Sequence, residues 1–180
     1  LGHHKHVATP EDPATARYGE MLYTFFFRSV FGAYLKAWKW EALRLKRMDL
    51  PAFHWRNQMI WFQVVQIGYL VAVGLIFGWS TVPFAIIIAV GGVALLEAVN
   101  YVEHYGLLRK KLKSGRYEPV KPEHSWNSNH EIGRIFLFEL TRHADHHYKA
   151  TRKYQILRHF ENSPLLPTGY PGAIWLAMFP

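Results

Sequence analysis

Three histidines stand close together at positions 143, 146 and 147, in the string L-T-R-H-A-D-H-H. On an α-helix, positions i, i+3 and i+4 share one face and span an arc of roughly 100°. Because imidazole binds iron, zinc and copper well, His143, His146 and His147 are predicted to hold a transition metal. Asp145 points away from that face, so we expect it to support the helix or orient a ligand rather than bind the metal. Three solvated histidines on an exposed helix are the alternative.

Further metal-binding candidates flank a long apolar region. The pair His3 and His4 precedes it, and His104 ends it. If the region crosses a membrane twice, the chain returns to the side it left, and all these histidines can meet at one site. Glu97 and Asn100 share a helix face with His104, and they either line the site or hydrogen-bond a neighbouring helix. The sequence contains no cysteine, which excludes thiolate ligands and leaves His, Asp and Glu.

Other polar residues are candidates for supporting roles. Asp12 follows His4 closely and is predicted to orient a ligating imidazole. The string W-N-S-N-H at 126–130 is dense in polar groups. Its Asn127 and His130, together with His124, either lie beside the metal or line a substrate passage. Alternatively, Asn127 or Asn129 caps the helix that follows.

The middle of the sequence contains two apolar segments. Residues 59–79 carry no charge, and residues 84–102 contain a single acid. Each approaches the roughly 20 residues that cross a hydrocarbon core, and the short turn between them predicts an antiparallel transmembrane hairpin. A buried hairpin of a large soluble protein is the alternative. We therefore predict an all-α membrane bundle, with residues 1–180 forming part of a single domain.

The flanking segments are predicted from their composition. Residues 17–48 mix aromatic and basic side chains, which favours a helix in the membrane interface over an ordinary amphipathic core helix. Residues 7–16 contain two prolines and are predicted to form a turn-rich connector, with Thr15 capping the next helix. Residues 131–149 are predicted to form one helix. Residues 163–180 contain four prolines and are predicted to be irregular at the membrane surface.

The basic residues are distributed as in a membrane protein. Lys and Arg number 21 against 13 Asp and Glu, which gives a net charge of +8. Nine of them precede the apolar region, twelve follow it, and the turn at 80–83 has none. This pattern places both flanks in the cytoplasm and argues against nucleic-acid binding.

Several strings in the sequence together resemble one known family, the integral-membrane alkane 1-monooxygenases. These enzymes belong to a wider histidine-rich di-iron group that includes the membrane fatty-acid desaturases. The matching strings are G-H-H at 2–4, H-V-A-T-P-E-D-P at 6–13, N-Y-V-E-H-Y-G-L at 100–107, S-W-N-S-N-H at 125–130, L-T-R-H-A-D-H-H at 140–147 and L-P-T-G-Y-P-G at 166–172.

The resemblance implies a non-haem centre of two iron ions that activates O2 and converts medium-chain n-alkanes to 1-alcohols. It implies electrons from rubredoxin and its reductase, and a site on the cytoplasmic face of a bacterial inner membrane. It also implies the ligands His3, His4, His104, His143, His146 and His147.

The resemblance further implies a first histidine box, and three further ligands in all, upstream of Leu1. The sequence does not begin with Met, so we expect a fragment of a longer protein that is inactive by itself. Thr141 replaces a glutamine common in the third box, a change that we expect to be tolerated. A desaturase or a xylene-type hydroxylase remains an alternative, as does a membrane cytochrome that binds haem through two histidines.

Overall fold

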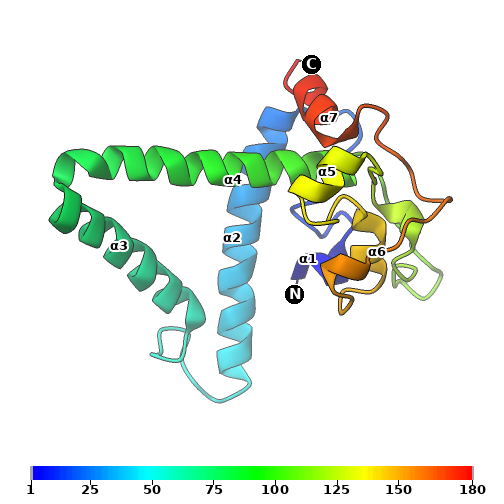
Figure 1. Cartoon of the computed structure of the whole chain (residues 1–180). Helices are drawn as coiled ribbons and strands as arrows, with labels where there is room; N and C mark the ends of the chain where they lie inside the picture. Colours follow the sequence, from blue (N-terminus) through cyan, green and yellow to red (C-terminus); the bar gives the residue numbers. More distant parts are fainter. Residues whose placement is uncertain (1, 180) are drawn as a thin grey trace. The chain divides into compact units, whose positions relative to one another are not determined.

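A computed structural model of the chain describes residues 2–179 (Figure 1). In this range the β-structure is limited to isolated bridges between Lys111 and Tyr117 and between Asn127 and Leu165. The all-α prediction is thus confirmed. The helical elements, in chain order, are α1 (Gly2–His6), α2 (Leu22–Lys46), α3 (Gln58–Phe77), η1 (Trp79–Thr81), α4 (Val82–His104), η2 (Pro122–His124), α5 (Glu131–Phe136), α6 (His143–Tyr148), η3 (Tyr154–Ile156) and α7 (Gly169–Ala177).

The chain folds as two compact units. One unit contains the chain up to Val30 and from Leu96 onward, and the other contains Phe31–Leu95. Every predicted metal ligand lies in the first unit. That residues 1–180 belong to a single domain stays a prediction.

The unit Phe31–Leu95 contains most of the apolar hairpin. Asn57 begins α3, because its side-chain oxygen accepts a hydrogen bond from the Met59 amide at 2.8 Å. At the other end of α3, Gly74 packs against the Trp79 ring so closely that an added Cβ would lie 2.6 Å from it. The stretches Gln58–Phe77 and Trp79–His104 are each long and apolar enough to cross a membrane. They agree with the segments predicted at 59–79 and 84–102.

The other unit has a small apolar core around the end of α4. Phe25 of α2 packs edge-on against Tyr101 with ring centroids 5.4 Å apart, and the Tyr101 hydroxyl donates to the carbonyl of Glu20 at 2.6 Å. Leu166 and Tyr170 complete this core from the C-terminal segment. The core fixes the end of α4, which carries His104.

Three predictions about local structure were wrong. The predicted helix over 131–149 is two short helices, α5 and α6, because Phe138 and Glu139 adopt φ angles of 51° and 61°. Residues 163–180 are not irregular throughout, since α7 forms there with Pro171 in its first turn, where a missing N–H costs no hydrogen bond. Thr15 does not cap α2, which begins at Leu22.

Candidate metal centre

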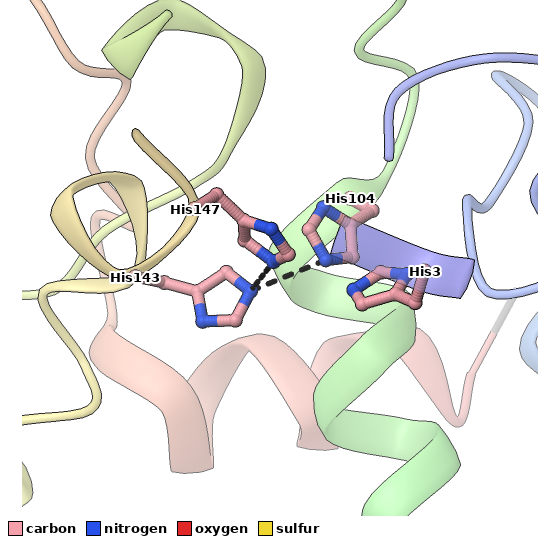
Figure 2. Close-up of side chains that lie close together, drawn as sticks. All are labelled: His3, His104, His143 and His147. Atoms are coloured by element: carbon pink, nitrogen blue, oxygen red, sulfur yellow. Dashed lines mark hydrogen bonds between the residues drawn. The ribbon is translucent and has the colours of Figure 1, made fainter. Parts of the chain in front are cut away.

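Six histidines from three helices meet in one place. His3 and His4 come from α1, His104 ends α4, and the remaining three lie on α6. Four of them, His3, His104, His143 and His147, offer ligand nitrogens that all lie within 4.8 Å of one another (Figure 2). The structure thus brings together residues separated by more than 100 positions in the sequence.

His4 and His146 form the edge of the same group. Their ring centroids are 4.7 Å apart, and the His4 ring lies 4.8 Å from that of His147. His104 is fully buried, and His143 and His147 are nearly so. His4 and His146 are only partly buried. The predicted ligands therefore divide into an inner set of four and an adjacent pair.

The contacts inside the inner set suit a cation. The Nε2 atom of His143 lies 2.8 Å from Nε2 of His147 and 3.2 Å from Nε2 of His104. A ring nitrogen has either one hydrogen or one lone pair, so these contacts cannot all be good hydrogen bonds. A metal bound to all three nitrogens would satisfy them together, because bonds of about 2.0–2.1 Å place neighbouring ligand atoms about 3 Å apart.

The electrostatics of the pocket also suit metal binding. Burial, together with the neighbouring imidazoles, holds the pKa of His143 and of His147 well below the usual value. Burial, followed by His146 and His3, lowers the pKa of His4 to about 4. These rings are therefore neutral at physiological pH, which is the form that binds metal ions.

Asp12 lies on the outer side of His3. Its Oδ2 is 2.9 Å from Nδ1 of that ring, an arrangement that leaves Nε2 of His3 for the cluster. Although burial raises the pKa of Asp12, the hydrogen bond from His3 holds it below its usual value. A carboxylate that accepts from the far nitrogen of a ligating imidazole is a common device for orienting it.

Glu103 contacts the cluster from α4, and the sequence interpretation had given it no role. Its Oε2 lies 3.1 Å from Nε2 of His143, and its Oε1 accepts from the Tyr170 hydroxyl at 2.7 Å. Burial and the Glu103 carboxylate raise the pKa of Tyr170 well above its ordinary value, so the phenol keeps its proton. The signal available in the sequence was the position of Glu103 directly before His104.

The short helix α6 is held by two buried polar residues. Asn127 accepts from the Ala144 amide at 2.7 Å and donates to the Ser163 hydroxyl. Asn127 thus supports the first turn of α6 rather than α5, whose N-cap is His130. Asp145, also buried, accepts from the Arg158 amide at 2.8 Å and pairs with Arg152 at 3.3 Å, so it ties the following loop to α6.

Helix α1 is held by Arg109 from the loop after α4. Its guanidinium donates to the carbonyls of Lys5 at 2.9 Å and Val7 at 2.8 Å, and to that of Glu118 at 3.0 Å. The Arg109 amide also donates to the carbonyl of Ala8 at 2.7 Å. The C-terminal carbonyls of a helix need such partners, and here they fix the helix that presents His3 and His4.

The remaining predicted candidates do not belong to the inner set. His130 is exposed, and His124 is buried where its Nδ1 accepts from the Lys121 amide at 3.0 Å. Glu97 is buried and accepts from Asn100 at 3.4 Å. A cavity beside the cluster, described below, is lined by Asn100 but not by Glu97.

A cavity of about 250 Å³ opens onto the imidazoles. Its lining combines four apolar residues with His3, His143, His146 and His147 and with Asn100, Glu103 and Tyr170. The apolar residues are Leu96, Val99, Leu137 and Leu140. A larger cavity, of about 430 Å³, is lined by Tyr101, Tyr105 and Trp126 among others and by none of the six histidines.

Comparison with known proteins places this site in a family. The sequence pattern of the family described as fatty acid desaturase matches residues 1–175. The chain belongs to this family. It is 52% identical over 179 residues to alkane 1-monooxygenase 2 of Pseudomonas aeruginosa. The matched region covers 99% of this chain and 48% of the relative. The predicted kinship with alkane 1-monooxygenases is thus confirmed.

Two further relatives extend the comparison. The chain is 46% identical to the alkane 1-monooxygenase of Ectopseudomonas oleovorans, over 99% of the chain and 45% of the relative. It is 26% identical to the xylene/toluene monooxygenase hydroxylase component XylM of Pseudomonas putida, over 92% of the chain and 44% of the relative. The chain spans about half the length of the curated relatives it matches.

Proposed function

We propose that this chain supplies six imidazoles to a non-haem di-iron centre that hydroxylates the terminal carbon of medium-chain n-alkanes. The ligands are His3, His4, His104, His143, His146 and His147. The proposal is supported by their convergence, by the family and by the names of the most similar relatives. The inner set of four suits one ion. His4 and His146 are then available to a second, together with ligands from the rest of the protein.

The apolar cavity beside the imidazoles carries this proposal. An alkane has no group that can hydrogen-bond, so only shape and apolar contact can orient it. The four apolar residues named above line the same cavity as four of the histidines, so a hydrocarbon chain bound there would lie against the site and exclude water. Asn100 and Glu103 also line this cavity.

The membrane hairpin explains how such a substrate arrives. Alkanes partition into the hydrocarbon core of a bilayer, and His104 ends the second apolar stretch, Trp79–His104. The site therefore lies where this helix leaves the membrane. Since the basic residues flank the hairpin on both sides, we place the site on the cytoplasmic face of a bacterial inner membrane.

The chemistry needs electrons as well as a metal. When bound, the two irons would supply O2 activation and the insertion of one oxygen atom into a terminal C–H bond. We propose rubredoxin, reduced by its own reductase, as the electron donor. The exposed basic residues of the loop after α4 would attract an acidic carrier, and they include Lys110, Lys111, Lys113 and Arg116.

Product analysis tests the function. The complete protein, expressed with rubredoxin and its reductase in a host without alkane hydroxylase, is expected to convert n-octane to 1-octanol. Replacing His143 or His147 by alanine should abolish the product. An unsaturated fatty acyl product would instead indicate a desaturase, and oxidation of a xylene methyl group alone would indicate a xylene-type hydroxylase. A Soret band in the purified protein would indicate a haem protein.

A further inference from the structure

The position of Glu103 relative to the inner histidines has a consequence for the metal shell. Its Oε2 lies 3.1 Å from Nε2 of His143. This is the nitrogen that also lies 2.8 Å and 3.2 Å from the Nε2 atoms of His147 and His104. The ligand atoms that all lie within 4.8 Å of one another are those of the four histidines, and the carboxylate oxygen meets this group through His143. Its separation from His143 equals the distance of about 3 Å expected for neighbouring ligands of one metal ion.

Hydrogen bonding alone does not explain this arrangement. The single hydrogen or lone pair of His143 Nε2 cannot serve two imidazoles and a carboxylate at once. Glu103 is 4% exposed, and burying an ionised carboxylate is costly unless a cation compensates it. The cations Arg152 and Arg158 are paired with Asp145 instead. A bound metal would provide the missing positive charge.

Tyr170 fixes the carboxylate from the opposite side. Its hydroxyl donates to Oε1 at 2.7 Å, and the ring is 3% exposed. With Oε1 held by this bond, Oε2 is directed at the histidines. The backbone of Glu103 is fixed as well, because its carbonyl accepts from the Trp126 amide at 2.9 Å.

We propose that Glu103 supplies a carboxylate oxygen to the metal centre and that Tyr170 is the positioning residue that directs it there. This inference rests on the proposed function, which requires a metal at the histidines. It adds an anionic ligand to a shell that otherwise consists of neutral imidazoles. An anionic ligand favours ferric over ferrous iron, so Glu103 lowers the reduction potential of the ion it binds.

The test uses the complete protein, purified and loaded with iron. The variants are Glu103→Gln, Tyr170→Phe and their combination, with Glu123→Gln as the matched control on an exposed residue. Iron affinity is measured by competition with a chelator, and the reduction potential by redox titration. Glu103→Gln is expected to weaken iron binding at least about tenfold and to make the potential more positive. Tyr170→Phe should change the iron affinity and the potential in the same direction, but by less. The double variant should change them no more than Glu103→Gln does.

The outcomes separate the two proposals. If the unmodified protein binds no iron, the proposed function fails, and this inference fails with it. If it binds iron but Glu103→Gln keeps the same affinity and potential, only the role of Glu103 is rejected. Thermal unfolding of the metal-free variants detects a folding defect. If Glu103→Gln does not fold, the test depends on Tyr170→Phe, because this variant keeps the carboxylate. An unchanged iron affinity and potential in Tyr170→Phe would then overturn the proposal.

Discussion

Asp12 is buried and pairs with the partly buried ring of His3, with Oδ2 and Nδ1 2.9 Å apart. The same carboxylate oxygen accepts from the Thr15 hydroxyl at 2.7 Å, and the Thr15 oxygen accepts from the Ala8 amide at 2.9 Å. The turn after α1 therefore folds around the carboxylate. Because an ionised carboxylate can only accept, the proton of His3 resides on Nδ1, and the lone pair of Nε2 faces the cluster.

Replacing Asp12 by asparagine is expected to weaken iron binding by the complete protein about 10–100-fold. The amide keeps the size of the side chain but removes the negative charge that fixes the tautomer of His3. Asp49→Asn is the matched control, because Asp49 is exposed and its φ of 54° suits asparagine equally well. A chelator competition titration that gives equal affinities for both variants would contradict the assigned role.

Replacing Arg109 by lysine is expected to destabilise the fold around α1. Lysine cannot reproduce the planar fork that serves the carbonyls of Lys5, Val7 and Glu118. We expect a loss of about 1–3 kcal/mol in the free energy of unfolding, because partly buried carbonyls lose their partners. Iron affinity should fall with it, since α1 carries two ligands. The control is Arg116→Lys at an exposed site, and unfolding of the metal-free variants gives the comparison.

The features that were predicted correctly are those that a regular spacing or a local composition of the sequence indicates. The two apolar helices of membrane length were predictable because residues 59–79 carry no charge and residues 84–102 only a single acid. The shared face of His143, His146 and His147 follows from the helical period, although α6 is only six residues long. Those features depend on residues that are neighbours in the sequence.

What the sequence could not predict depends on which particular residues become partners in the folded chain. The break between α5 and α6 is stabilised by the Arg134–Glu139 ion pair at 2.8 Å and by the Ser128 amide, which donates to the Thr141 carbonyl at 2.8 Å. Glu103 similarly meets Tyr170 across 67 positions. Helix propensity contains no information about such partners, so a continuous helix was the natural expectation over 131–149.

Replacing Asn127 by alanine is expected to loosen α6. The variant leaves the Ala144 amide, at the first turn of α6, without the side-chain oxygen that accepts from it at 2.7 Å. Loss of such a cap costs about 1 kcal/mol, and more when the donor is buried. Asn129→Ala is the control, since Asn129 is exposed and its contacts with Arg142 are long, at 3.3 and 3.4 Å. Thermal unfolding of the metal-free protein should show a lower midpoint for Asn127→Ala alone.

Reversing the charge of Lys110 and Lys111 tests the surface proposed for the electron donor. Both side chains are exposed in the loop that Arg109 connects to α1. If an acidic carrier docks there, the double change to glutamate should raise the KM for reduced rubredoxin about tenfold and reverse its dependence on ionic strength. The kcat for n-octane at saturating carrier should change little. Reversing Lys46 and Arg47 alters the net charge equally at another exposed site, so an equal rise in KM there would show a general charge effect rather than docking.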